Sequence, residues 1–160
     1  MQRIGFLIAI DFLVTVAGLC LAHAAPAQSV LEARAKGSFE EVRQLLVIAI
    51  EGQGLVVDHV SNVGDMLART GQDLGATTRL YERAEVLQFC SANYSRQLMG
   101  ADPRLLAFCP FGVGIYTLPG ETDTVHLVYR RMQADGVNPA AADALKKIDG
   151  VLAEILRDAQ

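Results

Sequence analysis

Stretches with a two-residue hydrophobic period alternate with stretches of helical period along most of this chain, and no other feature constrains the fold as much. A two-residue period is typical of a strand with one buried face, and a 3.6-residue period is typical of a helix with one buried face. The first pattern predicts strands at residues 30–36, 55–61, 84–90, 112–118 and 124–131. The second predicts helices at residues 39–52 and 63–73, after Ser91, from Pro103 and after Asn138.

The order of these elements predicts an α+β fold. Helices separate the first three strands, but residues 112–118 and 124–131 follow each other across the turn sequence PGETD, which indicates a β-hairpin. We therefore expect a single mixed or antiparallel sheet of about five strands, with the hairpin at one edge. The helices are expected to pack mainly on one face of this sheet.

Capping signals place the helix ends. Ser38 and Glu41 form a capping box, Ser91 and Asp102 are N-cap residues for two short helices, and Asn138 opens the last helix. The helical period then predicts which residues of the first and last helices are buried. These are Phe39, Val42, Leu45, Leu46 and Ala49 in the first, and Ala142, Leu145, Ile148, Leu152 and Ile155 or Leu156 in the last.

The N-terminus has the pattern of a secretory signal peptide. Arg3 gives a short positive start, an apolar run follows, and Ala22 and Ala24 form an A-x-A cleavage site. We expect residues 1–24 to be removed and residues 25–160 to form a single domain that is periplasmic or secreted. The apolar run is also nearly long enough to remain as an uncleaved anchor. The domain is expected to meet a membrane only through such an uncleaved signal segment.

The charge of the chain argues against a nucleic-acid partner. The formal net charge is −4, and the sequence contains no basic run. Proteins that bind the phosphate backbone carry a clustered positive charge. The sequence therefore predicts no nucleic-acid binding.

Three segments carry a resemblance to a known family. GSFEEVRQLLVIAIEGQGLVV, VLQFCSANYSRQLMGADPRLLAFCPFGVGIYTL and VHLVYRR are similar to the domain of unknown function 302 family, over roughly residues 30–132. The most specific matching residues are Cys90, Asp102, Pro103, Pro110, Ile115 and Tyr116. The resemblance implies a compact α+β domain that often forms homodimers, and it implies no established activity.

No combination of residues in the sequence predicts catalysis. Acid–base chemistry needs two titratable groups at one site, but Asp58 and His59 are neighbours on a predicted strand and point to opposite faces. The sequence has no glycine-rich phosphate loop, no G-x-S-x-G motif and no H-E-x-x-H motif. We therefore expect that the chain is not an enzyme.

A haem- or copper-binding protein is an alternative function. His59, His126 and Met99 are candidate cofactor ligands, because imidazole and thioether groups suit copper and haem iron. Covalent haem attachment is excluded, since no C-x-x-C-H motif occurs. The candidates have no tight spacing, so the sequence assigns no metal site.

Cys90 and Cys109 are predicted to form a disulfide. Removal of the signal peptide also removes Cys20, which leaves two cysteines in a compartment that favours oxidation. One cysteine ends a predicted strand, and the other stands just before the next. The alternative is a thiol–disulfide redox protein that uses the same pair, because Cys90 lies near a helix N-terminus.

The favoured interpretation is an exported, non-catalytic binding or accessory domain. Four aromatic residues lie along the predicted hairpin, where they either fill the core or line a binding surface: Phe108, Phe111, Tyr116 and Tyr129. A second copy of the chain, an unknown small ligand and a periplasmic protein are the expected partners.

Overall fold

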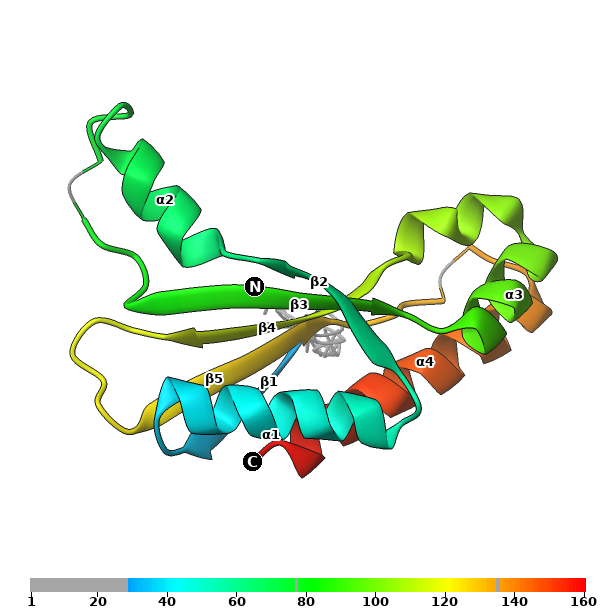
Figure 1. Cartoon of the computed structure of the whole chain (residues 1–160). Helices are drawn as coiled ribbons and strands as arrows, with labels where there is room; N and C mark the ends of the chain where they lie inside the picture. Colours follow the sequence, from blue (N-terminus) through cyan, green and yellow to red (C-terminus); the bar gives the residue numbers. More distant parts are fainter. Residues whose placement is uncertain (1–28, 77, 135) are drawn as a thin grey trace, which may run out of the picture.

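The computed structural model describes residues 29–76, 78–134 and 136–160, which form one sheet and the helices around it (Figure 1). The strands are β1 (Val30–Lys36), β2 (Val56–Ser61), β3 (Arg83–Cys90), β4 (Phe111–Thr117) and β5 (Thr124–Arg130). The helices are α1 (Phe39–Gly52), α2 (Val63–Gly71), α3 (Ala92–Ala101), the 3-10 helix η1 (Pro103–Phe108) and α4 (Pro139–Asp158). The α+β prediction is confirmed, and the predicted element bounds lie within two residues of the observed ones.

The sheet has the strand order β1-β5-β4-β3-β2, and every neighbouring pair is antiparallel. The prediction of an edge hairpin is wrong, because β4 is the central strand and β5 lies between β4 and β1. The cause is the long-range pairing of β1 with β5, which runs from Val30 opposite Arg130 to Lys36 opposite Thr124. A local hairpin pattern carries no information about such a distant partner.

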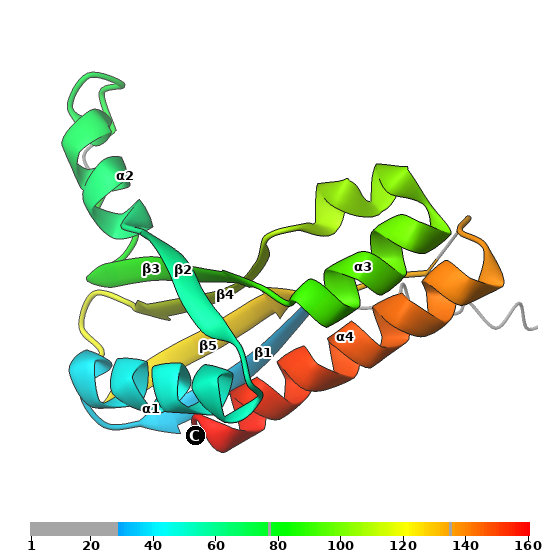
Figure 2. The same ribbon diagram turned by 45° about the vertical axis from the view of Figure 1, so that its right-hand side comes forward.

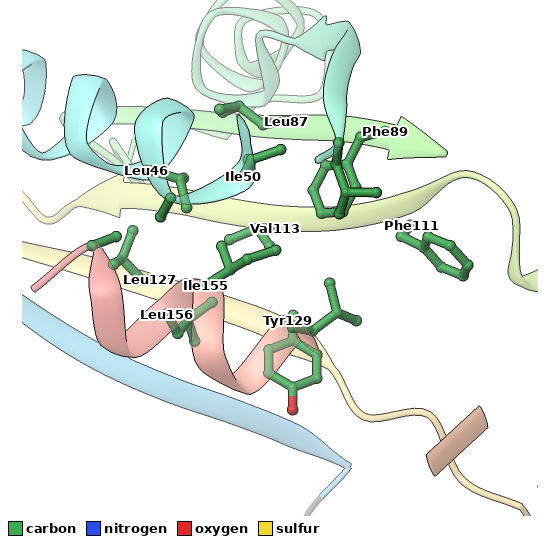
Figure 3. Close-up of a cluster of buried hydrophobic side chains, with 14 of the residues drawn as sticks. Leu46, Ile50, Leu87, Phe89, Phe111, Val113, Leu127, Tyr129, Ile155 and Leu156 are labelled. Atoms are coloured by element: carbon green, nitrogen blue, oxygen red, sulfur yellow. The ribbon is translucent and has the colours of Figure 1, made fainter. Parts of the chain in front are cut away.

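The main core lies between the sheet and two helices, α1 and α4, which pack on the same face (Figure 2). Side chains alternate along each strand, so β4 directs Val113 and Ile115 toward these helices. Figure 3 shows Leu46 of α1 and Ile155 of α4 within this cluster. The prediction that the helices pack mainly on one face is confirmed.

Two predicted core positions are wrong. Leu45 is 41% exposed, and Ile50 is buried in α1 instead. Ala142 is only partly buried, whereas Ala141 is fully buried in α4. Both errors lie at the margin of an apolar stripe, where the helical period alone does not fix which residue faces the sheet.

The predicted caps are confirmed. The Ser38 hydroxyl accepts the backbone N–H of Glu41, and the Glu41 side chain accepts the backbone N–H of Ser38. Asn138 caps α4 by accepting the N–H of Ala141, and its side-chain amide donates to the carbonyl of Ala101 at 2.9 Å. This last bond fixes the start of α4 against the end of α3.

The predicted signal peptide, residues 1–24, lies outside the described residues. Among the helices of the described part, none has the length and apolar character needed to cross a membrane.

Candidate functional site

The face of the sheet opposite α1 and α4 carries the residues with the most unusual environments. Among the described helices, α2 and η1 stand near the two ends of the sheet on this side and leave its middle uncovered (Figures 1 and 2). We call this surface the open face. Strand alternation and register assign to it Glu32 and Arg34 of β1, Ala84, Val86 and Gln88 of β3, Gly112, Gly114 and Tyr116 of β4, and Thr124, His126, Val128 and Arg130 of β5.

The middle of the open face is flat and apolar. A Cβ atom added to Gly114 would lie 3.0 Å from Val128 Cγ2, and one added to Gly112 would lie 3.3 Å from Val86 Cγ1. The two valine side chains therefore lean over the glycine backbone and occupy the space where larger side chains would project. Both valines are partly buried.

His126 is the most deeply buried charged or polar residue on the open face, with a relative exposure of 4%. Its Nδ1 lies 3.1 Å from Glu32 Oε1, and its Nε2 lies 2.9 Å from Glu121 Oε2. Carboxylates only accept hydrogen bonds, so both ring nitrogens can donate only when the imidazole is doubly protonated. The ring therefore lies between two hydrogen-bond acceptors.

This charged cluster alters the acidity of its members. The hydrogen bond from His126 lowers the pKa of Glu121, and it also lowers the pKa of Glu32 together with a hydrogen bond from Arg34. Tyr116 stacks on the imidazole with ring centroids 4.6 Å apart and planes 5° apart. Both nitrogens of His126 face carboxylates on opposite sides of the ring, so neither is free to bind a metal or to accept a substrate proton.

A projecting helix borders the open face. We call residues Val63–Ala76, which comprise α2 and the turn after it, the arm. The arm starts where Gly64 packs against β3, since a Cβ at Gly64 would lie 2.8 Å from the backbone nitrogen of Ala84. No residue of α2 is buried, and along the arm Met66 is 41% and Leu74 is 80% exposed.

The structure brings the two cysteines together. β3 and β4 pair Phe89 with Phe111, so Cys90 and Cys109 flank the end of this ladder. Both are free thiols, with Cys90 exposed and Cys109 partly buried. Ser95 Oγ lies 3.7 Å from Cys109 Sγ, and Asp58 accepts the backbone N–H of Cys90 at 3.2 Å.

The surroundings of Cys90 do not favour the thiol–disulfide redox alternative. Partial burial raises the pKa of the Cys90 thiol to about 11, and the hydrogen bond to the Cys109 thiol and the negative charge of Asp58 act in the same direction. A redox-active cysteine needs a thiolate that is populated near neutral pH. The disulfide stays a prediction that the proximity of the two thiols supports.

The structure does not gather the three candidate cofactor ligands at one centre. His59 lies exposed on the edge strand β2, and β3 and β4 separate it from His126 on β5, a distance of about 14 Å at the usual strand spacing. Met99 is partly buried on α3. Within the described residues, no cluster of three or more His, Cys, Asp or Glu side chains is arranged to hold a metal ion.

Sequence reasoning missed the two carboxylates beside His126. The contact with Glu121 could have been predicted from the sequence, because Glu121 lies five positions before His126 across the predicted hairpin turn. The contact with Glu32 could not, because Glu32 reaches His126 only through the pairing of β1 with β5.

Comparison with known proteins agrees with the fold and the resemblance. The family model described as Domain of unknown function DUF302 matches residues 31–155. A crystal structure of an uncharacterized conserved DUF302 protein from Bacillus stearothermophilus superposes with a TM-score of 0.71 at 16% identity, over 84% of this chain and 100% of that one. At this identity the likeness shows the fold alone. Comparison with curated proteins gives no significant match.

Proposed function

The chain belongs to the family of the domain of unknown function DUF302, and we propose that it is an exported, non-catalytic binding domain whose partner surface is the open face together with the arm. The partner that we propose for this surface is a second copy of the chain.

The observation that carries this proposal is the environment of α2. This helix has nine residues and buries none of them. Helices of this length are marginal in water without tertiary packing. Met66 and Leu74 expose apolar surface on the arm, which borders the open face, so a partner that covers both regions would stabilise the arm.

The composition of the open face suits pairing with itself. Its apolar middle is bordered by side chains of both charge signs, among them Glu32, Arg34 and Arg130. An apolar centre with a polar rim is the usual anatomy of a protein interface. In a twofold dimer each patch meets its own copy, so a patch that carries both signs can offer each charge an opposite one.

The size of this surface is of the right order for a dimer. Five strands of about seven residues cover about 24 Å by 24 Å at standard strand spacings and rises. With the arm added, the surface approaches the roughly 800 Å² that each partner contributes to a typical interface.

The environments of His126 and Cys90 support a non-catalytic role. Both ring nitrogens of His126 are engaged with carboxylates. The raised pKa of Cys90 opposes formation of a nucleophilic thiolate.

Sedimentation of three variants tests the binding surface. We expect the wild-type chain to be a dimer and Leu74→Glu in the arm to be a folded monomer, because the added charge would have to be buried against the partner. Ile48→Glu is the matched control, since Ile48 is a 55% exposed apolar residue on α1, and this variant should remain a dimer. A monomeric wild-type protein, or a dimer lost in Ile48→Glu and kept in Leu74→Glu, would refute the proposal.

Cell fractionation tests export. Expressed with its own N-terminus in a Gram-negative host, the chain should be found in the periplasm about 24 residues shorter. A product that stays full-length and membrane-bound would show a signal-anchored domain instead.

A further inference from the structure

We propose that Cys90 and Cys109, in their reduced state, form a two-coordinate binding site for Cu(I). The site is distinct from the dimer surface proposed above and from the three ligand candidates His59, His126 and Met99.

The backbone holds both sulfur atoms in place. Cys90 is the last residue of β3, and it pairs with Val56 of β2 on one side while its neighbour Phe89 pairs with Phe111 of β4 on the other. Cys109 stands two residues before Phe111 and ends η1, where its N–H donates to the carbonyl of Leu106 at 3.0 Å. The Cys109 thiol helps to raise the pKa of the Cys90 thiol, so the two donors lie close together without an ion.

The donor set selects the ion. Thiolates are soft ligands that favour Cu(I), and two of them complete the linear coordination that this ion accepts. Zinc needs four ligands, but within the described residues no third His, Cys, Asp or Glu joins the pair to make a metal cluster. The exposed position of Cys90 leaves a path for the ion to enter.

The neighbouring groups suit a bound cation between two thiolates. The backbone of Phe111 is hydrogen-bonded to Cys90, and the Ser95 hydroxyl lies 3.7 Å from Cys109 Sγ, so each sulfur has a hydrogen-bonding neighbour that can orient it. The Asp58 carboxylate beside Cys90 raises the pKa of its thiol and opposes the negative charge of the loaded site, so binding should strengthen as the pH rises.

The binding step is a proton exchange without redox change. One Cu(I) ion forms two S–Cu bonds, two S–H bonds break, and two protons pass to solvent, which leaves a site with a net charge of one negative unit. A disulfide between the same sulfurs excludes the ion, so oxidised and copper-bound protein are alternative states.

Titration of the reduced chain under anaerobic conditions tests the site. Cu(I) is added in competition with the chromophoric chelator bicinchoninate, and we expect one ion per chain. Cys90→Ser and Cys109→Ser should each abolish this binding, and Ser95→Ala should weaken it about tenfold as expected for an outer-shell contact. Met99→Leu is the control that should bind like the wild type, and Zn(II) should not bind with comparable affinity.

A second readout avoids dependence on variants that fail to fold. One equivalent of Cu(I) should protect both thiols of the wild-type chain from alkylation, as mapped by mass spectrometry of the digested protein. The proposal is overturned if either thiol stays reactive at full loading, if a folded Cys90→Ser variant binds as tightly as the wild type, or if Met99→Leu loses the ion. None of these results depends on the dimer, so the two proposals fail independently.

Discussion

The two faces of the sheet bury their residues in different ways. Leu127 and His126 are neighbours on β5, point to opposite faces and are both buried. Helices α1 and α4 cover Leu127 (Figure 3), whereas His126 is enclosed by Glu32, Glu121 and Tyr116, which belong to the sheet and its turn. The first face is stabilised by apolar packing against helices. The second is held by one charged cluster and leaves its middle available to a partner.

The largest effect should come from placing a charge on the helix-covered face. Leu127→Asp puts an unpaired carboxylate among fully buried apolar side chains, so we expect it to lose at least about 3 kcal/mol of unfolding free energy or to fail to fold. Ile115→Asp should behave in the same way, because Ile115 is also fully buried on this face. Urea unfolding measures the loss.

The matched control for Leu127→Asp is Val128→Asp, one residue along the same strand. Val128 is only partly buried on the open face, so this variant should fold with a loss of about 1 kcal/mol and should dissociate the dimer. Equal destabilisation of the two variants would contradict the contrast between the faces.

Oxidation of the cysteine pair should have the next largest effect. If Cys90 and Cys109 are joined in exported protein, the bond closes a loop of the size expected to contribute about 3 kcal/mol to stability. Thiol counting on the denatured protein, isolated without reductant, should give no free thiols. Two free thiols would refute the disulfide prediction and would show the pair in the reduced state that Cu(I) binding requires.

A smaller effect is expected from removing the imidazole ring that links the two carboxylates of the open face. His126→Gln cannot donate charge-assisted hydrogen bonds to both Glu32 and Glu121, so we expect a loss of about 2 kcal/mol. The loss should be much smaller when Glu121→Gln is already present, which a double-mutant cycle measures as a coupling energy. Full additivity of the two changes would show that the cluster does not act as a unit.

The pH dependence of stability should report the same cluster. The pKa values of Glu32 and Glu121 are lowered from 4.5 in the folded chain, with the His126 hydrogen bond as the first cause. Their contribution is therefore complete above the unfolded pKa and is lost as the pH falls through the folded pKa. Below about pH 5, wild-type stability should fall more steeply than that of His126→Gln, as followed by thermal unfolding. Parallel curves for the two proteins would argue against this assignment.

The local elements could be predicted from the sequence because their signals are local. Ser38, Ser91, Asp102 and Asn138 identify helix starts by hydrogen bonds within three residues. The proximity of the two cysteines also followed from local order, since β3 and β4 are joined by short helices.

The strand order and the charged cluster could not be predicted in this way. The residues that pair β1 with β5 are 88 to 100 positions apart in the chain, and this one pairing makes the hairpin internal and brings Glu32 to His126. The alternating pattern of β5 allowed His126 to lie on either face, because Val128 and Leu127 are both apolar. Only the position of α1 and α4 decides which of the two faces is covered.

Intermolecular methyl contacts test most directly the claim that the open face and the arm receive a second copy. In a mixed sample of isotope-labelled and unlabelled chains, nuclear Overhauser effects between copies should involve the methyl groups of Val86, Val128 and Leu74. Methyl groups of Ile48 on α1 should show no such contacts. Contacts between copies that involve Ile48, with none from Val86, Val128 or Leu74, would contradict the account.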